Sequence, residues 1–284
     1  MAVDLQALYP KLIHLMLDTV FVVDKDNQIV FVSDACESLL GYLPQELIGT
    51  LITNYMHPDD LAATRDSIVR VMSGKPHIDY RNRYIRKDGG IVHILWSARW
   101  YEAEEVRVGV ARNVTALMQA EEELRYLAHH DPLTKLTNRA LFYDRLTLGL
   151  SMAHRYQSNL ALLFLDINDF KSINDVHGHA AGDRVLCTVA RRLEGCVRET
   201  DTVARMGGDE FTVLLTDIKS KNAVAEKVGQ ILTVMNEPLS AEFGELRMPS
   251  CSIGVACYPE DGKDADTLLS RADSHMYQIK RRSR

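Results

Sequence analysis

The sequence predicts a two-domain protein of mixed α+β and α/β class, with a helical linker between its two parts. Three observations lead to this prediction. The chain has 284 residues, a length that suggests about two domains. Its first part consists of short β-rich runs and short helical segments separated by turn residues. From residue 139 onward, segments with helical periodicity alternate with strand-like runs.

The composition excludes several classes of protein. Hydrophobic residues make up 46% of the chain and charged residues 25%, an ordinary globular balance. The net charge of -6 is shared equally by residues 1–118 and the remainder, so no nucleic acid partner is expected. The five cysteines form no C-x-x-C pair, which argues against a disulfide framework and favours a cytoplasmic location. No transmembrane segment or signal peptide is expected, because the longest apolar run spans only residues 160–165.

The N-terminal part carries the signals of a β-rich domain. Asp26 and Asn27 supply a turn between two β-rich runs, which predicts a hairpin. Pro58 begins a helix that Gly74 ends. Three further strand-like runs follow at residues 78–87, 91–102 and 106–114.

Five motifs in this part resemble a PAS domain over residues 8–115: VFVVDKDNQIVFVS, LLGYLPQELIGT, MHPDDL, IRKDGG and ARNVT. The resemblance implies an antiparallel sheet with flanking helices, acting as a sensor or dimerisation domain. The cysteine motif of flavin-binding relatives is missing, and His57 precedes the long helix instead of lying within it. The PAS ligand therefore stays unknown. Trp96 and Trp100 share a strand face, either as core or as the lining of a ligand pocket, with core favoured.

Residues 116–130 are predicted to form a signalling helix between the PAS region and a second domain at residues 131–284. Leu117, Ala120, Leu124 and Leu127 recur at 3-4-3 spacing, a seam of two heptads. Such a helix between two domains fits a rigid lever better than a flexible linker. Asp131, followed by proline, is expected to cap a new helix.

The C-terminal part brings acidic residues to the ends of predicted strands. Asp166 ends an apolar strand, and Asp209 and Glu210 directly follow the glycines of a hairpin at residues 203–216. If these strands are neighbours, three carboxylates converge on one edge, which suits Mg²⁺ bound together with substrate phosphates. The alternatives are a solvated strand end and a plain tight turn. Helices are predicted at about 139–156, 168–177, 180–197, 220–235 and 265–281, and a further strand within 246–258.

The segment after Asp166 carries groups that suit a nucleotide. Phe170 and Lys171 start the next helix, where backbone N–H groups and a lysine meet phosphates. Asn174 and Asp183 offer an amide and a carboxylate that suit a base edge. Taken alone, these two residues are equally typical of helix capping and turn formation.

Four motifs, ARMGGDEF, FLDINDFKSINDVHGHAAGD, DPLTKLTNR and RADSHMYQIKRRSR, resemble the GGDEF family of diguanylate cyclases over about residues 127–284. The resemblance implies a nucleotidyl-cyclase-like palm, with a mostly antiparallel central sheet surrounded by helices, that makes cyclic di-GMP from two GTP. It assigns Mg²⁺ or Mn²⁺ to Asp166, the carbonyl of Ile167, Asp209 and Glu210, with either Asp209 or Glu210 as the catalytic base. It assigns guanine to Asn174 and Asp183, the triphosphate to Phe170, Lys171, Lys280 and Arg284, and close backbone approach to Gly207 and Gly208.

The resemblance also implies assembly and regulation. One domain holds one GTP, so a homodimer is required, and the PAS region and linker helix are the expected means of control. Arg198 and Asp201 match the R-x-x-D site at which the product cyclic di-GMP inhibits, although a surface ion pair is the simple alternative. The competing function is a non-catalytic receptor for GTP or cyclic di-GMP. Three departures from the family pattern, Lys135, Asn168 and Ser283, fall on none of the assigned ligands.

Overall fold

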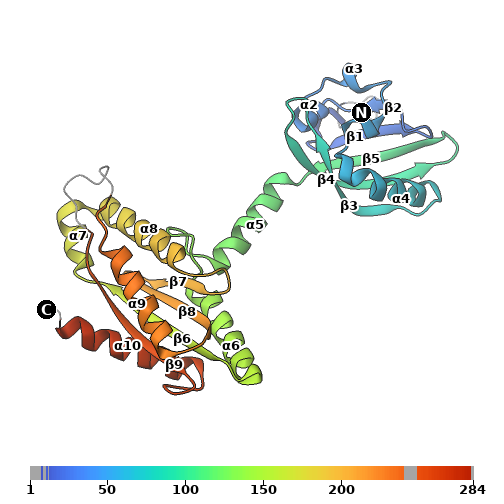
Figure 1. Cartoon of the computed structure of the whole chain (residues 1–284). Coiled ribbons are helices and arrows are strands. Elements are labelled where there is room, and N and C mark those ends of the chain that lie inside the picture. The colour runs from blue at the N-terminus through green and yellow to red at the C-terminus, as the bar shows by residue number, and fades with distance from the viewer. Residues whose placement is uncertain (1–7, 9–10, 12, 240–247, 283–284) are drawn as a thin grey trace, which may run out of the picture. The chain divides into compact units, whose positions relative to one another are not determined.

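The chain divides into two compact units, residues 1–122 and 123–284, each with a sheet of its own. The computed structural model describes residues 8, 11, 13–239 and 248–282. Both units contain antiparallel sheets with helices, so the predicted mixed class is confirmed (Figure 1). No helix in the described ranges is long and apolar enough to cross a membrane.

The sheet of the N-terminal unit runs in the order β2-β1-β5-β4-β3, with every neighbouring pair antiparallel. The predicted hairpin is confirmed, and Asn27 in its turn has φ 69°, a left-handed conformation that asparagine tolerates. The strands are β1 (Thr19–Asp24), β2 (Ile29–Val32), β3 (His77–Ile85), β4 (Ile91–Tyr101) and β5 (Val106–Asn113). The helices are α2 (Cys36–Leu40), α3 (Pro44–Leu47), the 3-10 helices η1 (Ile52–Tyr55) and η2 (Pro58–Asp60), and α4 (Leu61–Met72).

The core of the N-terminal unit lies on one face of this sheet. Alternate residues of β1 and β4 are buried, as the pleat requires when one face is covered. Trp96 belongs to this core and lies with its ring centroid 5.5 Å from that of Phe21 and 5.7 Å from that of Tyr84. Trp96 also lines a cavity, so the two interpretations offered for it do not exclude each other.

The predicted linker helix is present as α5 (Thr115–His129). No residue of α5 is buried, and three leucines of the predicted seam, Leu117, Leu124 and Leu127, are 56%, 67% and 39% exposed. Uncovered leucines at heptad spacing are typical of a helix that packs against a partner helix.

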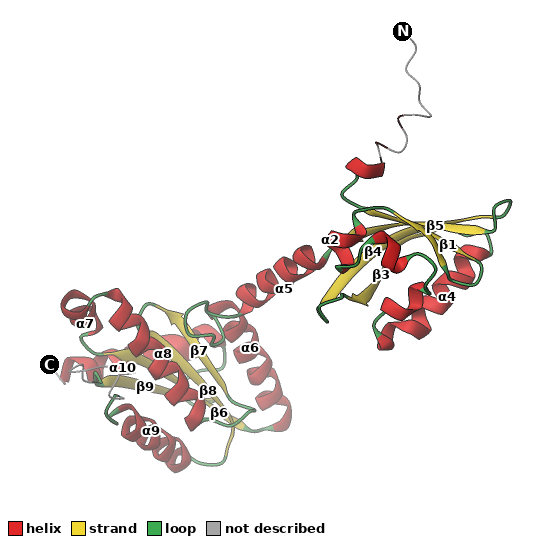
Figure 2. Ribbon diagram, turned by 90° about the horizontal axis from the view of Figure 1, so that it is seen from above, coloured by secondary structure: helices red, strands yellow, loops and turns green. Residues whose placement is uncertain are grey.

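The C-terminal unit has a sheet in the order β7-β8-β6-β9, again antiparallel throughout, and Figure 2 shows its helices around the sheet. The predicted helices are confirmed to within two residues at their ends. The helices are α6 (Arg139–Tyr156), α7 (Phe170–His177), α8 (His179–Cys196), α9 (Lys221–Met235) and α10 (Ala265–Arg282). The strands are β6 (Asn159–Ile167), β7 (Thr202–Gly207), β8 (Glu210–Ile218) and β9 (Cys251–Tyr258).

The central strand β6 sends its side chains to two different cores. Leu163 and Leu165 belong to the cluster formed with α8 and α9. Leu162 and Phe164 belong to the cluster formed with α6 and α10. Because side chains alternate between the faces, Asp166 continues the second series and lies on the side of α6 and α10.

Helix α10 lies directly on β9 because one position of that strand has no side chain. A Cβ atom built on Gly254 would overlap the Ala272 carbonyl oxygen and the Met276 backbone nitrogen. Neither is the end of a flexible side chain, so the helix itself would have to move. Gly254 therefore sets how closely α10 approaches the sheet.

We expect Gly254→Ala to lower the free energy of unfolding by about 1–3 kcal/mol, because overpacking forces the backbone to shift. Gly229→Ala is the control, since its added Cβ meets nothing within 4 Å, and alanine in the α9 interior should stabilise by about 0.5–1 kcal/mol. Guanidinium unfolding followed by far-ultraviolet circular dichroism measures both. A Gly254→Ala variant as stable as the wild type would contradict this account of the packing.

Candidate active site

The ends of β6 and β8 bring two acidic side chains together. Asp166 pairs with Glu210 of β8 on one side and with Ser252 of β9 on the other. Asp166 is only 8% exposed. Directly opposite residues in an antiparallel pair have their Cβ atoms about 4.5–5.5 Å apart, and like charges placed there are destabilising. The predicted neighbourhood of β6 and β8 is confirmed, and it creates a site that favours a cation.

Lys280 of α10 supplies one cation. Its Nζ donates a hydrogen bond to Asp166 Oδ1, and both side chains are largely buried. The close approach of α10 to β9 at Gly254 brings the lysine to this strand end. The resemblance had assigned Lys280 to the triphosphate, whereas in the structure it contacts a proposed metal ligand.

The carboxyl group of Glu210 responds to its surroundings. Burial raises its pKa above the ordinary value, and the nearby negative charges of Asp166, Asp273 and Asp209 raise it further. Arg139, at the start of α6, acts in the opposite direction. Sequence reasoning did not single out Asp273 or Arg139, because only the packing of α6 and α10 on this face brings them near Glu210.

The hairpin turn before Glu210 has a backbone that requires glycine. Gly207 has φ 146° and Gly208 has φ 53°, and both values disfavour L-residues with side chains. A Cβ atom on either residue would meet nothing within 4 Å, so the space beside the turn is open. Across the turn, the Ile167 backbone N–H donates to the Asp209 carbonyl at 3.3 Å. Asp209 is thereby joined to the end of β6.

Arg205 binds the backbone of the same turn. Arg205 Nε and Nη2 donate to the Gly208 carbonyl at 3.0 and 2.7 Å. Its Nη1 donates to both carboxylate oxygens of Asp131 at 3.0 and 3.2 Å. Burial raises the pKa of Asp131, but hydrogen bonds from Thr134 and Arg205 outweigh this effect and hold the pKa below its ordinary value.

Asp131 corrects one sequence prediction. It does not cap a helix; its Oδ1 accepts from the backbone N–H and hydroxyl of Thr134, which closes a turn. The cap of α6 is Asn138, whose side chain accepts from the Leu141 N–H. The prediction was wrong because Asp and Asn stabilise turns and helix starts by the same kind of hydrogen bond.

Two of the departures from the family pattern have a structural setting. Lys135 has φ 64°, which explains why glycine is usual at this position. Asn168 donates to the Ser250 hydroxyl and accepts from the Ser252 hydroxyl, both at 2.9 Å. Its side chain therefore joins the end of β6 to the start of β9. Ser283 and Arg284 lie outside the described residues.

The residues predicted to contact guanine come from two packed helices. Gly182 of α8 lies under α7, because a Cβ atom there would collide with the side-chain amide of Asn174 and approach the Phe170 ring. The structure thus brings Asn174 close to Gly182, the residue before Asp183. The side chain of Asp183 is exposed. Lys171, in the first turn of α7, is exposed as well.

The predicted R-x-x-D site forms a turn between α8 and β7. Asp201 Oδ2 accepts from the Arg198 backbone N–H at 3.0 Å, and its Oδ1 accepts from the Thr216 backbone N–H at 3.1 Å. Both oxygens of Asp201 therefore stabilise the backbone, while the Arg198 side chain is exposed. A surface ion pair was the simple alternative for these two residues. In the structure, Asp201 instead accepts hydrogen bonds from these two backbone N–H groups.

The donor set at the end of β6 fits a hard divalent cation. Asp166, Asp209, Glu210 and the Ile167 carbonyl supply only oxygen, the ligand that Mg²⁺ and Mn²⁺ prefer. Within the part of the chain that the structure describes, no three His, Cys, Asp or Glu side chains are grouped tightly enough to form a metal site by themselves. Phosphate oxygens of a substrate are the ligands that Mg²⁺ sites commonly add to one or two carboxylates.

Comparison with known families identifies this arrangement. A family model described as diguanylate cyclase, GGDEF domain, matches residues 128–284. The chain belongs to the GGDEF family. A second model, described as PAS fold, matches residues 29–111. The GGDEF turn at Gly207 and Gly208, with its two acids, is thus the family's own motif in its folded setting.

Two curated relatives of this GGDEF protein are named diguanylate cyclases, and the GGDEF domain of one has been solved. Diguanylate cyclase TpbB of Pseudomonas aeruginosa is 44% identical over 168 residues, 59% of this chain and 39% of TpbB. The solved GGDEF domain of TpbB has a TM-score of 0.53 and 45% identity, covering 55% of this chain and 91% of that one. Diguanylate cyclase DgcM of Escherichia coli O157:H7 is 34% identical over 265 residues, 90% of this chain and 62% of DgcM. The chain spans less than two thirds of either curated relative.

A third relative is known with a nucleotide. The structure described as the coiled coil and GGDEF domain of DgcB from Caulobacter crescentus in complex with c-di-GMP has a TM-score of 0.53 and 28% identity. The match covers 60% of this chain and 90% of the DgcB chain.

We expect Asp131→Asn to destabilise the C-terminal unit by about 1–3 kcal/mol at pH 7, because Arg205 loses its charged partner. The lowered pKa of Asp131 means that its contribution is present above the unfolded-state pKa of about 3.9 and is lost as the pH falls through the folded-state pKa. The difference between variant and wild type should therefore shrink from pH 7 to pH 3. Guanidinium unfolding by circular dichroism at these pH values, with exposed Asp144→Asn as control, measures it; a pH-independent difference would contradict the ion-pair explanation.

Proposed function

We propose that this protein is a diguanylate cyclase that condenses two GTP into cyclic di-GMP and two pyrophosphates. The observation that carries the proposal is the strand pairing of buried Asp166 with half-buried Glu210 beside the glycine turn, in a chain of the GGDEF family. The naming of TpbB and DgcM as diguanylate cyclases supports it.

Each half of the reaction forms one phosphate ester bond and breaks the phosphoanhydride bond between the α- and β-phosphates of one GTP. The ribose 3′-oxygen of one GTP attacks the α-phosphorus of the other, and pyrophosphate leaves with the electrons of the broken P–O bond. Asp166, Asp209, Glu210 and the Ile167 carbonyl would hold Mg²⁺ or Mn²⁺, which would polarise the phosphate and lower the pKa of the attacking hydroxyl. Asp209 or Glu210 accepts the proton of that hydroxyl. In the second half the two nucleotides exchange roles, and the same kind of attack closes the ring.

The packing of α7 and α8 supports a binding role for polar side chains of both helices. Asn174 and Asp183 are proposed to bind guanine, and the backbone at Phe170 with Lys171 to bind the triphosphate. Lys280 donates a hydrogen bond to Asp166 and would also contact the phosphates of the substrate. Arg284 is proposed as a further phosphate contact from sequence alone.

A homodimer is proposed as the active form, since each GGDEF domain would hold one of the two GTP molecules. We propose a PAS sensor at residues 8–115, a signalling helix at 116–130 and a cyclase domain at 131–284. The exposed leucines of α5 support helix pairing, because burying one leucine contributes about 1.5–3 kcal/mol. Changes in that pairing would alter how the two cyclase domains meet. The five free cysteines support the proposed cytoplasmic location.

Product inhibition is proposed at Arg198 and Asp201. The exposed guanidinium of Arg198 suits bidentate contact with a guanine edge or a phosphate. The carboxylate of Asp201 stabilises the turn that presents this arginine. The c-di-GMP complex of DgcB supports nucleotide binding by this family.

The alternative function, a receptor that binds GTP or cyclic di-GMP without turnover, is not favoured. Gly207, Gly208, Asp209 and Glu210 are all intact, and a receptor has no need of two carboxylates placed opposite each other at the strand end. Binding of GTP with Mg²⁺ but without release of pyrophosphate would distinguish the receptor from the enzyme.

We expect Glu210→Gln to lower cyclic di-GMP formation from GTP and Mg²⁺ by at least about 100-fold, the scale of losing a group that acts in the transition state. The same change should raise the free energy of unfolding without metal by less than about 1 kcal/mol, because it removes a charge that the nearby negative charges of Asp166, Asp273 and Asp209 disfavour, while solvent screens the effect. Chromatographic product analysis and guanidinium unfolding measure the two effects. Exposed Glu226→Gln on α9 should change neither, and an active Glu210→Gln enzyme would overturn the proposed site.

We expect Arg198→Ala to raise the concentration of cyclic di-GMP that half-inhibits the enzyme by at least about tenfold, equivalent to 1.4 kcal/mol of lost binding. The initial rate without product should be unchanged, since Arg198 lies outside the proposed catalytic residues. Exposed Arg155→Ala on α6 is the charge-matched control. An inhibition curve identical to that of the wild type would reject Arg198 as a product contact.

A further inference from the structure

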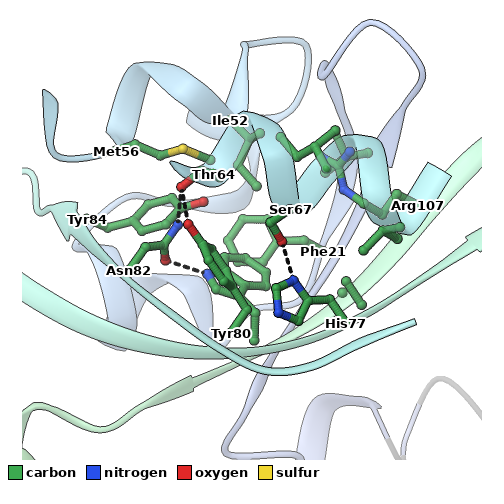
Figure 3. Close-up of a pocket in the computed structure, with 16 residues that line it drawn as sticks. Phe21, Ile52, Met56, Thr64, Ser67, His77, Tyr80, Asn82, Tyr84 and Arg107 are labelled. Carbon is green, nitrogen blue, oxygen red and sulfur yellow. Dashed lines mark hydrogen bonds between the residues drawn. The ribbon is translucent and has the colours of Figure 1, made fainter. Parts of the chain in front are cut away.

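The N-terminal unit contains a cavity with a volume of about 50 Å³. Figure 3 shows aromatic and polar side chains around it, among them Phe21, Tyr84 and Arg107. Its lining comes from the inner face of the sheet, from η1 and from α4. The lining residues are Phe21, Val23, Ile52, Met56, Thr64, Ser67, Ile68, Val71, His77, Tyr80, Asn82, Tyr84, Trp96, Ala98, Arg107 and Gly109.

Most polar side chains of this lining bind one another. The Thr64 and Tyr80 hydroxyls share a hydrogen bond of 2.8 Å, and the Asn82 amide donates to Thr64 at 3.2 Å. Trp96 Nε1 donates to the Asn82 oxygen at 2.8 Å. Ser67 shares a hydrogen bond of 2.7 Å with His77 Nδ1 on the other side of the cavity. These contacts leave Arg107 outside the network.

Arg107 stands where an apolar side chain is expected. In β5 the buried positions alternate, so Arg107 shares the inner face of the sheet with Gly109 and Ala111. Gly109 leaves room for the Trp96 ring, which a Cβ atom would approach to 3.2 Å. Arg107 is 7% exposed, and its Nη2 donates to Asn27 Oδ1 at 3.2 Å.

The second terminal nitrogen of Arg107, Nη1, is buried without a hydrogen-bond partner. Over the described residues, the other such side-chain atom is the Thr212 hydroxyl, which is neutral. An unpaired buried charge is far more unfavourable than an unpaired hydroxyl. The cavity therefore holds an incompletely paired cation on its wall.

The surroundings of Arg107 offer little compensation for its charge. Burial lowers its pKa, while Tyr84 and Asp24 oppose that shift. Asp24 uses Oδ1 to accept the backbone N–H groups of Asp26 and Gln28 in the hairpin turn. None of the sixteen lining residues is Asp or Glu. An anion inside the cavity would supply the missing partner.

We propose that this cavity is a binding site for a short-chain carboxylate, whose anionic group pairs with Arg107 and whose carbon chain contacts Phe21, Val71 and Trp96. Arginine presents parallel N–H donors that match the two oxygens of a carboxylate. The apolar and aromatic side chains beside it suit the chain of the ligand.

The size and charge of the cavity limit the class of ligand. Drug-sized ligands occupy pockets of about 300–1,000 Å³, so a flavin or a haem would need a much larger space. One guanidinium balances one negative charge, which favours a monocarboxylate over a doubly charged phosphate. Carboxylic acids of two or three carbons come nearest to both limits.

Isothermal titration of the full-length protein with acetate, propionate and pyruvate tests the proposal. Propionamide serves as the neutral analogue of propionate, and inorganic phosphate as the alternative anion. At least one carboxylate should bind with Kd below 1 mM, and propionamide and phosphate at least tenfold more weakly than that acid. Arg107→Gln should weaken carboxylate binding at least tenfold, which corresponds to about 1.4 kcal/mol. Arg112→Gln, the same charge change on β5 at an exposed ion pair with Asp18, should leave Kd within twofold.

Several results would overturn the proposal. They are no binding by any of the three acids, equal binding of propionamide or phosphate, and unchanged affinity in Arg107→Gln. Should Arg107→Gln fail to fold, Ala98→Val takes its place, because it narrows the cavity without changing a charge. That variant should also bind at least tenfold more weakly, and an unchanged Kd would exclude the cavity as the site. Tryptophan fluorescence reports folding of this unit, since Trp96 and Trp100 are the tryptophans of the chain.

Discussion

The antiparallel pairing of β6 with β8 is the constraint on which the candidate active site depends. Its register places Asp166 directly opposite Glu210, so two carboxylates share one half-buried strand end. Such an arrangement is unfavourable by itself and becomes favourable only with a cation. Lys280 provides one positive charge in the structure, and the oxygen ligands around it suit a divalent metal.

The rest of the C-terminal unit holds this strand end in position. Gly254 lets α10 lie close enough to β9 for Lys280 to reach Asp166. Arg205, which is paired with Asp131, donates to the Gly208 carbonyl, and the Ile167 N–H donates to the Asp209 carbonyl. Asp209 and Glu210 thus lie at a turn in which the Gly208 and Asp209 carbonyls both accept hydrogen bonds. A site placed on such a rigid support needs little reorganisation when substrate binds.

Each unit contains a site with a surplus of one sign of charge, negative in the C-terminal unit and positive in the N-terminal unit. At the end of β6 a surplus of negative charge favours a metal and a positively charged side chain. In the cavity beside β5, a buried arginine without a carboxylate partner favours a small anion. The proposed enzyme activity and the proposed ligand site depend on different residues. An experiment that contradicts one proposal therefore does not contradict the other.

The sequence by itself determined the fold class, the helices and the motifs. Helical periodicity, turn residues and the glycines before Asp209 are local signals, because backbone conformation depends mainly on neighbouring residues. The departure at Lys135 was visible in the sequence, but the positive φ that explains it was not.

Only the tertiary structure decided which distant residues meet. The ion pair of Asp131 with Arg205 joins residues 74 positions apart, and the contact of Lys280 with Asp166 joins residues 114 positions apart. The burial of Arg107 likewise depends on which face of β5 the sheet covers. Charge pairing and burial depend on packing between elements, and a single sequence contains no direct record of that packing.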